Sequence, residues 1–478
     1  MIRIALKYSF LAAAIFWIAS NSIISAQAYI AQTKKKIDLI LNDDFFNSTL
    51  IAVDAYNLTT KTKVYQKNER YLLHPASTAK LITSIAGFHY LGKDYRFTTS
   101  LFHTGEIRDS VCYGDVYVIG GFDPDLVTEH LDSLSLLIRE YGINSFTGNL
   151  YADVSMMDSI YWGEGWMWDD NPSLDAPHLS PLVVNDAGIK VKYDPNGYGN
   201  PLKVSLIPHT KYFSIINNSI VGDSSNLTIS RAWMSNSNNI IIEGTFPSYG
   251  TGDIEKLNVY NPSKYFLFLF SEALERNKIR FGGYTDTLTL PLEAKYIGSI
   301  SHSLSQVAKD LNKRSKNLSA ELLLRAIAYS LYGKPASAKS GFKAIDKMLS
   351  EIGFTNNDFL LVDGSGLSHY NLVSARLLTE ILTDLYINKK DIFEELYKTL
   401  PIAGLDGTLE FRMKNGNAFN NVRAKTGTLR GVSCLAGYLT AKNGHKIAFS
   451  ILMQNHIEST RLSRNYQDQI CEILSSME

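Results

Sequence analysis

The hydrophobic pattern changes twice along the chain, and this limits what the chain can fold into. Residues 96–295 hold short strand-like segments such as GDVYVIGG and NIIIEGTF, separated by turn clusters such as DPNGYGNP. Helical patterns dominate after residue 296, and Asn443-Gly444 then predicts a hairpin between two late strands. We therefore expect a mixed α/β (α+β) domain built from both ends of the chain, with a large β-rich insertion between them.

The same pattern predicts where the domains begin and end. At 478 residues the chain is long for a single domain. The predicted boundaries are residues 29–95 and 296–478 for the outer domain, 96–185 and 258–295 for an inserted domain, and 186–257 for a smaller β domain nested within it. Basic and acidic residues number 47 each, so the net charge indicates neither a nucleic acid nor an anionic surface as partner.

The N-terminus has the order of a secretory signal. Two basic residues precede an apolar stretch, and the small-residue pattern A-Q-A follows at residues 26–28. An uncleaved membrane anchor is the alternative, and Asn21 and Ser22 disfavour it because they interrupt the apolar run. We expect residues 1–28 to be removed and the mature protein to lie outside the cytoplasm, in the periplasm or an equivalent compartment.

Cysteine usage is sparse. Cys112, Cys434 and Cys471 form neither a disulfide framework nor a metal-ligand spacing. One bridge is possible in an oxidising compartment, but a buried, inert thiol is the favoured role for each. The sequence implies no metal and no organic cofactor.

The segment HPASTAKLITSIAGFHYL places a serine and a lysine three residues apart at the head of an apolar run. Pro75 can start a helix there, so that Ser77 and Lys80 share one face. A serine hydroxyl needs a base to become a nucleophile, and a lysine can serve if burial lowers its pKa. The pair proves little alone, since Ser340 and Lys343 repeat it.

Two further tripeptides strengthen the assignment. Ser315-Lys316-Asn317 lies between two helical patterns, where a tight turn can project a hydroxyl and an amide into a cleft; its plain alternative is a helix N-cap. Lys425-Thr426-Gly427 begins the late strands, where an edge strand can offer N–H groups, a charge and a hydroxyl to a carboxylate. Lys339-Ser340-Gly341 is rejected as a third motif, because it falls between helices.

In this order the Ser77–Lys80 pair and the two tripeptides resemble the S-x-x-K, S-x-N and K-T-G motifs of penicillin-binding proteins and serine β-lactamases. The flanking segments NKRSKNLSAELLL, LVDGSGLSHYN and RAKTGTLRGVSCLAGYL resemble the D-alanyl-D-alanine carboxypeptidase/endopeptidase family of low-molecular-mass (class C) penicillin-binding proteins. The gap of 238 residues between Ser77 and Ser315 is longer than a compact β-lactamase would have. The resemblance implies a penicillin-binding/β-lactamase-like transpeptidase domain with extra domains inserted between its first two motifs.

The resemblance also implies roles for the motif residues. Ser77 would attack the carbonyl of the penultimate D-alanine, and Lys80 would take its proton. Ser315 would relay a proton to the leaving nitrogen, while Asn317 would orient Lys80 and hold a substrate amide.

The third motif would bind the end of the substrate. Lys425 and Thr426 would receive the terminal carboxylate, and Gly427 would let the substrate backbone approach. The N–H groups of Ser77 and Thr428 would form the oxyanion hole.

Two positions carry less specific implications. By likeness of the segment YADVSMMD, Asp153 would contact the amino group of the diamino acid in the stem peptide; a solvated surface aspartate is the alternative. Lys316 departs from a family that often has an acidic or polar residue there. Its charge would either lower the pKa of Lys80 further or face water.

These observations predict a secreted serine D,D-peptidase that hydrolyses peptidoglycan stem peptides and cross-links and is inhibited by β-lactams. A β-lactamase or esterase of the same fold and a non-catalytic wall-binding protein are the alternatives. The sequence leaves open the choice between carboxypeptidase and endopeptidase action, the diamino acid, the oligomeric state and the fold of the inserted domains.

Overall fold

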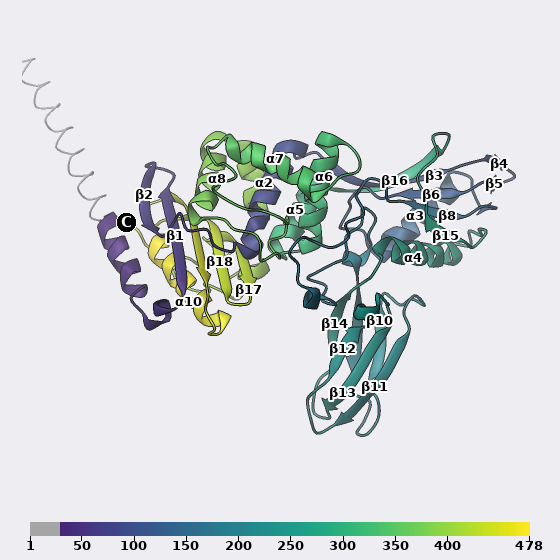
Figure 1. Cartoon of the computed structure of the whole chain (residues 1–478), viewed down its shortest axis with the longest axis horizontal. Helices are drawn as coiled ribbons and strands as arrows, with labels where there is room; N and C mark the ends of the chain where they lie inside the picture. Colours follow the sequence, from purple (N-terminus) through teal and green to yellow (C-terminus); the bar gives the residue numbers. More distant parts are fainter. Residues whose placement is uncertain (1–28) are drawn as a thin grey trace, which may run out of the picture. The chain divides into compact units, whose positions relative to one another are not determined.

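The computed structural model describes residues 29–478. The predicted signal peptide, residues 1–28, lies outside this part of the chain. Residue contacts divide the chain into two units. Figure 1 labels their helices and strands along the chain. The first unit comprises the described residues up to Thr78, Asn357–Phe359 and Leu372–Glu478, and the second comprises Ala79–Asn356 and Leu360–Asn371. The finer domain boundaries expected from the sequence stay a prediction.

The first unit is built on a five-stranded sheet of order β17-β18-β19-β1-β2, in which all neighbours are antiparallel. Its strands are β1 (Leu50–Asn57), β2 (Thr62–Lys67), β17 (Arg423–Leu429), β18 (Val432–Thr440) and β19 (Lys446–Gln454). Strand β1 pairs with β19 along its whole length, so the two ends of the chain share one sheet, as expected. The hairpin at Asn443-Gly444 is also confirmed, with Gly444 at φ +83°.

Helices cover both faces of this sheet. They are a helix over residues 29–40, α8 (Ala375–Asn388), α9 (Lys390–Thr399) and α10 (Thr460–Ser475). Ser450 of β19 donates to the carbonyl of Ala375 in α8, whereas its neighbour Phe449 shares an apolar cluster with Ile470 of α10. Successive strand residues point to opposite faces, so α8 and α10 lie on opposite sides of the sheet. Helix α9 was not predicted, and along it only Leu396 and Thr399 are buried.

The second unit contains a helical part formed by α2 (Ala79–Leu91), α5 (Leu304–Lys313), α6 (Asn317–Tyr332) and α7 (Ala338–Ser350). Helix α2 packs against the other three, and every residue from Ala79 to Phe88 is buried. Because α2 is buried on all sides, it forms the centre of this part rather than a surface helix. Any polar side chain at its start is therefore withdrawn from water.

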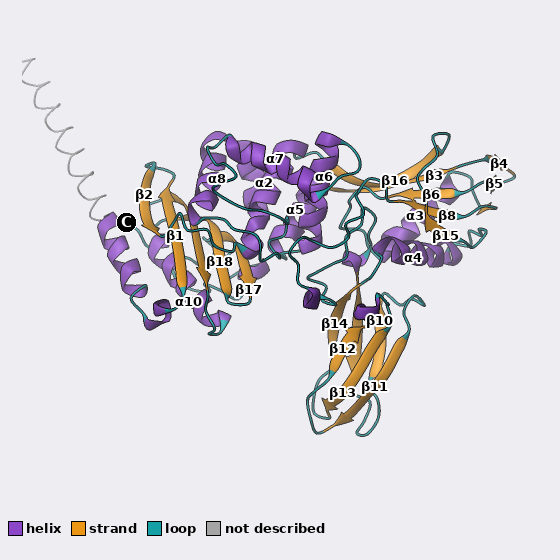
Figure 2. Ribbon diagram, in the orientation of Figure 1, coloured by secondary structure: helices purple, strands orange, loops and turns teal. Residues whose placement is uncertain are grey.

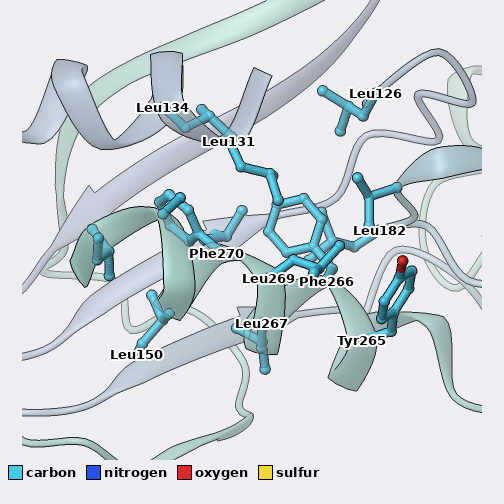
Figure 3. Close-up of a cluster of buried hydrophobic side chains, with 14 of the residues drawn as sticks. Leu126, Leu131, Leu134, Leu150, Leu182, Tyr265, Phe266, Leu267, Leu269 and Phe270 are labelled. Atoms are coloured by element: carbon cyan, nitrogen blue, oxygen red, sulfur yellow. The ribbon is translucent and has the colours of Figure 1, made fainter. Parts of the chain in front are cut away.

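The chain segment between α2 and α5 forms a second five-stranded sheet, of order β15-β8-β6-β3-β16. Its strands are β3 (Arg96–His103), β6 (Val116–Ile119), β8 (Leu150–Asp153), β15 (Thr285–Thr287) and β16 (Lys295–Ser303). Helices α3 (Thr128–Glu140) and α4 (Pro262–Arg276) pack together beside it. Figure 3 shows Leu131 and Leu134 facing Phe266 and Phe270 in its core.

Short strands complete the insertion (Figure 2). A small sheet joins β4 (Glu106–Arg108), β5 (Val111–Tyr113) and β7 (Ser145–Phe146). Two three-stranded sheets follow, one of β9 (Gly188–Asp194), β10 (Lys203–Ile207) and β14 (Asp253–Asn258), the other of β11 (Ile215–Gly222), β12 (Thr228–Arg231) and β13 (Ile240–Pro247). The stretch from 96 to 295 is thus rich in strands, as its pattern predicted.

Three chemical features of the described residues limit the kinds of site. No helix in residues 29–478 is long and apolar enough to cross a membrane. Within the same residues no group of three His, Cys, Asp or Glu side chains is placed to hold a metal ion. Cys112, Cys434 and Cys471 are buried and form no disulfide, and burial raises the pKa of the Cys434 thiol to about 12. The favoured interpretation of the cysteines as buried, inert thiols is confirmed.

Candidate active site

Ser77 lies on a tight turn at the end of the first unit. The turn is the 3₁₀ helix η2 (Ala76–Thr78), directly before α2, so Pro75 does start a helix. Ala76 has φ +46°, a left-handed conformation that costs a non-glycine residue of order 1 kcal/mol or more. The Pro75 carbonyl stabilises the turn by accepting from the backbone N–H and the hydroxyl of Thr78, at 3.2 and 2.6 Å. The turn places Ser77 directly after a strained residue, Ala76.

Strand β17 lies directly against this turn. A Cβ atom built on Gly427 would lie 2.6 Å from the Pro75 carbonyl oxygen and 3.1 Å from the Ser77 nitrogen. Backbone atoms cannot give way as a flexible side chain does, so a glycine is required here whatever the substrate needs. The K-T-G motif is therefore on a strand, as predicted, and beside the serine.

The side chains of β17 are fixed by neighbours that the sequence did not indicate. Lys425 is fully buried, and its Nζ donates to the carbonyl of Thr426 at 2.8 Å. The hydroxyl of Thr426 lies 2.8 Å from that of Thr408. Arg464 of α10 donates to the Thr428 hydroxyl at 3.3 Å. Because an arginine only donates, the Thr428 hydroxyl keeps its own proton for another acceptor, such as a carboxylate.

Lys80 is the second residue of α2, in the second unit. Its side chain is fully buried, and Nζ donates to Asn317 Oδ1 at 2.5 Å and to the Ser365 carbonyl at 2.6 Å. Burial lowers its pKa to about 8, and the more distant carboxylates of Asp363, Glu321 and Asp175 oppose that shift. The hydrogen bonds to neutral oxygens offset only part of the cost of burying the charge, so the proton leaves more easily than from a lysine in water.

The S-x-N motif occupies the turn between α5 and α6, as predicted. Ser315 has φ +60°, and Asn317 is the first residue of α6. Asn317 Nδ2 donates to the carbonyl of Asp175 at 2.6 Å, which leaves Oδ1 to accept from Lys80. Residues 315–317 line a cavity of about 590 Å³ together with Asp175 and Asp186, so the turn does face open space.

A buried carboxylate supports the backbone that contacts Lys80. Asp363 accepts five hydrogen bonds, from the N–H groups of Gly366 and Ser368 and from the side chains of Trp166, Ser365 and Asn371. Glu321 accepts from the Ser365 N–H at 2.9 Å. The segment DGSGLS is thus a supporting turn, and the sequence did not predict the contact of its Ser365 carbonyl with Lys80.

Asp153 lies at the end of β8 and is buried, so the interpretation as a solvated surface aspartate is wrong. Oδ1 accepts from the Ser155 N–H at 2.8 Å and Oδ2 from the Leu290 N–H at 2.9 Å. The residue lines a cavity of about 450 Å³. Both oxygens already hold the local backbone, which gives this carboxylate a structural role.

Lys316 follows neither of the two courses expected for it. Its ammonium pairs with Asp186 at 2.9 Å and with Asp310 at 3.3 Å, so it does not simply face water. The groups that shift the pKa of Lys80 do not include it. The rejected motif at residues 339–341 lies inside α7 and not between helices, so the expected position was wrong, but the motif is not on a strand and its rejection stands.

Comparison with known proteins now identifies the family. Residues 33–477 match the family model described as D-Ala-D-Ala carboxypeptidase 3 (S13) family. The chain belongs to this family. It is accordingly a serine-type carboxypeptidase, a hydrolase, and the predicted family and enzyme class are confirmed.

Curated relatives and solved structures agree with the family match. The chain is 29% identical over 453 residues to a D-alanyl-D-alanine carboxypeptidase of an Actinomadura species, covering 90% of this chain and 82% of that one. It is 29% identical over 401 residues to the D-alanyl-D-alanine carboxypeptidase DacB of Haemophilus influenzae, covering 83% of both. The crystal structure of penicillin binding protein 4 from the same organism superposes with a TM-score of 0.81 at 26% identity, covering 91% of this chain and 97% of that one. The predicted penicillin-binding/β-lactamase-like fold is confirmed.

Proposed function

We propose that the protein is a secreted serine D,D-peptidase that cleaves the D-alanyl-D-alanine bond of peptidoglycan stem peptides through an acyl-enzyme. In this proposal Ser77 attacks the carbonyl of the penultimate D-alanine, and the neutral amine of Lys80 takes its proton. The oxyanion forms beside the N–H groups of Ser77 and Thr428. Ser315 then passes a proton to the leaving amine, and water hydrolyses the acyl-enzyme.

The observation that carries the proposal is the environment of Lys80. A lysine is a useful general base near neutral pH only when its pKa approaches the working pH. Burial lowers the pKa of Lys80 to about 8, and Asn317 and Ser365 hold its ammonium through neutral oxygens. The serine three residues earlier in the chain lies on a strained turn, an arrangement that favours a nucleophile over a merely structural residue.

The chemistry of β17 indicates that this strand would bind the C-terminal end of the substrate. A terminal carboxylate needs donors and positive charge, which Lys425, Thr426 and Thr428 supply. Gly427 keeps the strand close to the Ser77 backbone, so carbonyl and carboxylate would be bound by adjacent groups. The role of Asp153 in binding a stem-peptide amine stays a prediction, because both of its oxygens accept from backbone N–H groups.

Family membership supports the wider assignment. A relative of this chain, the Haemophilus influenzae penicillin binding protein 4, has been solved in complex with a β-lactam. We infer that β-lactams acylate Ser77 here and that removal of residues 1–28 places the enzyme outside the cytoplasm, where peptidoglycan lies. The same acyl-enzyme serves carboxypeptidase and endopeptidase action, since the two differ only in the leaving amine.

The test is intact mass of the purified mature protein over time after addition of benzylpenicillin, with Ser77→Ala as control. We expect a lasting adduct of one penicillin in the wild type and none in the variant. A transient adduct with consumption of the drug would assign a β-lactamase. Absence of an adduct from the wild type would overturn the nucleophile and leave a wall-binding protein.

A second measurement separates the two leaving groups. The enzyme would be incubated with a pentapeptide ending in D-Ala-D-Ala and, separately, with a cross-linked muropeptide dimer. Release of D-alanine is expected from the first and conversion to monomers from the second. Loss of both reactions in Ser77→Ala assigns them to one site, whereas a reaction that persists in the variant does not belong to it.

A further inference from the structure

The turn that carries Ser315 and Asn317 is not held by its own backbone alone. Helix α5 ends at Lys313, Ser315 adopts φ +60°, and Lys316 is the N-cap of α6 without making a side-chain cap bond. A serine at positive φ is unfavourable and persists only where surrounding contacts impose it. The side chain of Lys316, which makes no cap bond, is therefore free to form other contacts that hold the turn.

Lys316 reaches across to the inserted segment. Its side chain is 20% exposed, and its ammonium lies 2.9 Å from Asp186 Oδ1 and 3.3 Å from Asp310 Oδ2. Burial alone would lower its pKa, but the carboxylates of Asp186, Asp125 and Asp310 together raise the pKa above the ordinary value. The ammonium is thus a fixed charge that bridges α5 to a segment more than 120 residues earlier in the chain.

A third carboxylate, that of Asp125, also interacts with this charge. Both oxygens of Asp125 are buried and make no hydrogen bond within the described residues. Burial raises the pKa of Asp125 to about 6, and the positive charge of Lys316 opposes that rise more than any other group does. Without Lys316, Asp125 would lose the positive charge that stabilises its carboxylate, and Asp186 and Asp310 would each lose an ion pair.

The partner turn is strained as well. Asn185, Asp186 and Ala187 have φ of +52°, +60° and +54°, three consecutive left-handed residues directly before strand β9. Such a run costs of order 1–2 kcal/mol per residue and needs external contacts. Asn185 is held by hydrogen bonds with Thr128, and Asp186 is held by Lys316. Two strained turns therefore stabilise each other through one ion pair.

The same inserted segment also holds Asn317, whose Nδ2 donates to the Asp175 carbonyl. Asp175 and Asp186 together therefore contact both residues that follow Ser315 in the motif. Resting on the proposed function, we propose that Lys316 is a positioning residue, which fixes the Ser315–Asn317 turn against the strained turn at residues 185–187. It touches neither substrate nor reacting atoms.

This role has a signature that a direct electrostatic role lacks. The charges that shift the pKa of Lys80 are Asp363, Glu321 and Asp175, not Lys316. Removing Lys316 should lower the rate of acylation without moving the pH midpoint of that rate. The ionisable groups around it are Asp125, Asp186, Asp310 and Arg314, with Asp123 and His302 beyond Asp125 and with Asp175, Lys190, Glu255 and Lys256 lining the same cavity.

The experiment measures acylation by benzylpenicillin from pH 6 to 10 and determines the binding constant and the acylation rate constant separately. The variants are Lys316→Met, Asp186→Asn and the double variant. Lys309→Met, an exposed lysine of α5, is the matched control. We expect Lys316→Met to lower the acylation rate constant about tenfold, with binding and midpoint unchanged. Asp186→Asn should lower it less, and the double variant should equal Lys316→Met rather than the product of the two effects. Lys316→Arg should restore most of the rate.

Each other outcome contradicts the inference. A wild-type rate in Lys316→Met, independent effects in the double variant or a shifted midpoint would each overturn it. Should Lys316→Met fail to fold, Asp186→Asn and Lys316→Arg carry the test, because both keep the turn's charge partners largely in place. Wild-type protein that forms no adduct overturns the proposed function as well, whereas normal acylation by every variant overturns the positioning role alone.

Discussion

Two lysines of the second unit are largely withdrawn from solvent, yet their pKa values shift in opposite directions. The ammonium of Lys80 contacts an amide oxygen and a backbone carbonyl, and burial lowers its pKa to about 8. The ammonium of Lys316 contacts two carboxylates, and its pKa is raised. Burial penalises both charges, so the difference comes from what each ammonium touches.

The difference also separates chemistry from architecture. A lysine held by neutral oxygens can release its proton near neutral pH and act as a base. A lysine paired with carboxylates stays charged and works as a fixed link between segments. Lys80 and Lys316 illustrate both uses. Asn317 connects them, because its side chain contacts Lys80 and it directly follows Lys316 in the sequence.

The two environments affect stability with opposite dependence on pH. The pKa of Lys80 is lower in the folded than in the unfolded state, so protonated Lys80 opposes folding below about pH 8, and this penalty disappears as pH rises towards 10.5. The folded-state pKa of Lys316 is raised, so its stabilising contribution is complete below about pH 10.5 and is lost as pH rises through the folded value.

The largest expected effect comes from removing the base. Lys80→Met keeps the length of the side chain and removes the amine, and we expect the rate of acylation by benzylpenicillin to fall by about 10³-fold. In the wild type that rate should rise with pH through about 8, because only the neutral amine accepts the proton of Ser77. Stopped-flow or mass-resolved acylation at pH 6 to 10 measures both. A Lys80→Met variant that retained the wild-type rate would remove Lys80 from the mechanism.

The sequence predicted the positions of the motifs because each depends on local pattern. The apolar run after Pro75 predicted a helix at Ser77, the flanking helices predicted the turn at Ser315, and the late strands predicted the position of Lys425. Local patterns fix such elements before any tertiary contact is known. The fold class followed from the same patterns together with the spacing of the motifs.

The sequence could not predict the contacts that set the chemistry. Ser365 contacts Lys80 through a backbone carbonyl, which any residue possesses, so its identity carries no signal. Asp186 lies about 130 residues before Lys316, and its left-handed turn has no glycine to mark it. Arg464 and Thr408 reach β17 from distant parts of the chain. Long-range pairing of this kind depends on packing, which a single sequence does not display.

An intermediate effect is expected when Lys80 is given the environment of Lys316. Asn317→Asp replaces the amide oxygen 2.5 Å from Lys80 by a carboxylate, which should raise the pKa of Lys80 by about 1–3 units. The pH midpoint of acylation should move upward by that amount, and the rate at pH 7 should fall about 10-fold or more. At pH 10 a large part of the rate should return. Asn317→Ala is the control, since it removes the oxygen without adding a charge. An unchanged midpoint in Asn317→Asp would show that the contact atom does not set the pKa.

The smallest effect is expected when one carboxylate is taken from Lys316. Asp310→Asn removes the contact at 3.3 Å and leaves the contact with Asp186 at 2.9 Å. Because one ion pair remains, Lys316 stays charged, and acylation should change less than about twofold. The turn itself should loosen by about 1 kcal/mol, which corresponds to about fivefold faster hydrogen exchange at the start of α6. Exchange of that helix, followed by mass spectrometry beside Lys309→Met, measures this. Unchanged exchange together with a large loss of acylation would assign Asp310 a chemical role and end the distinction between the two lysines.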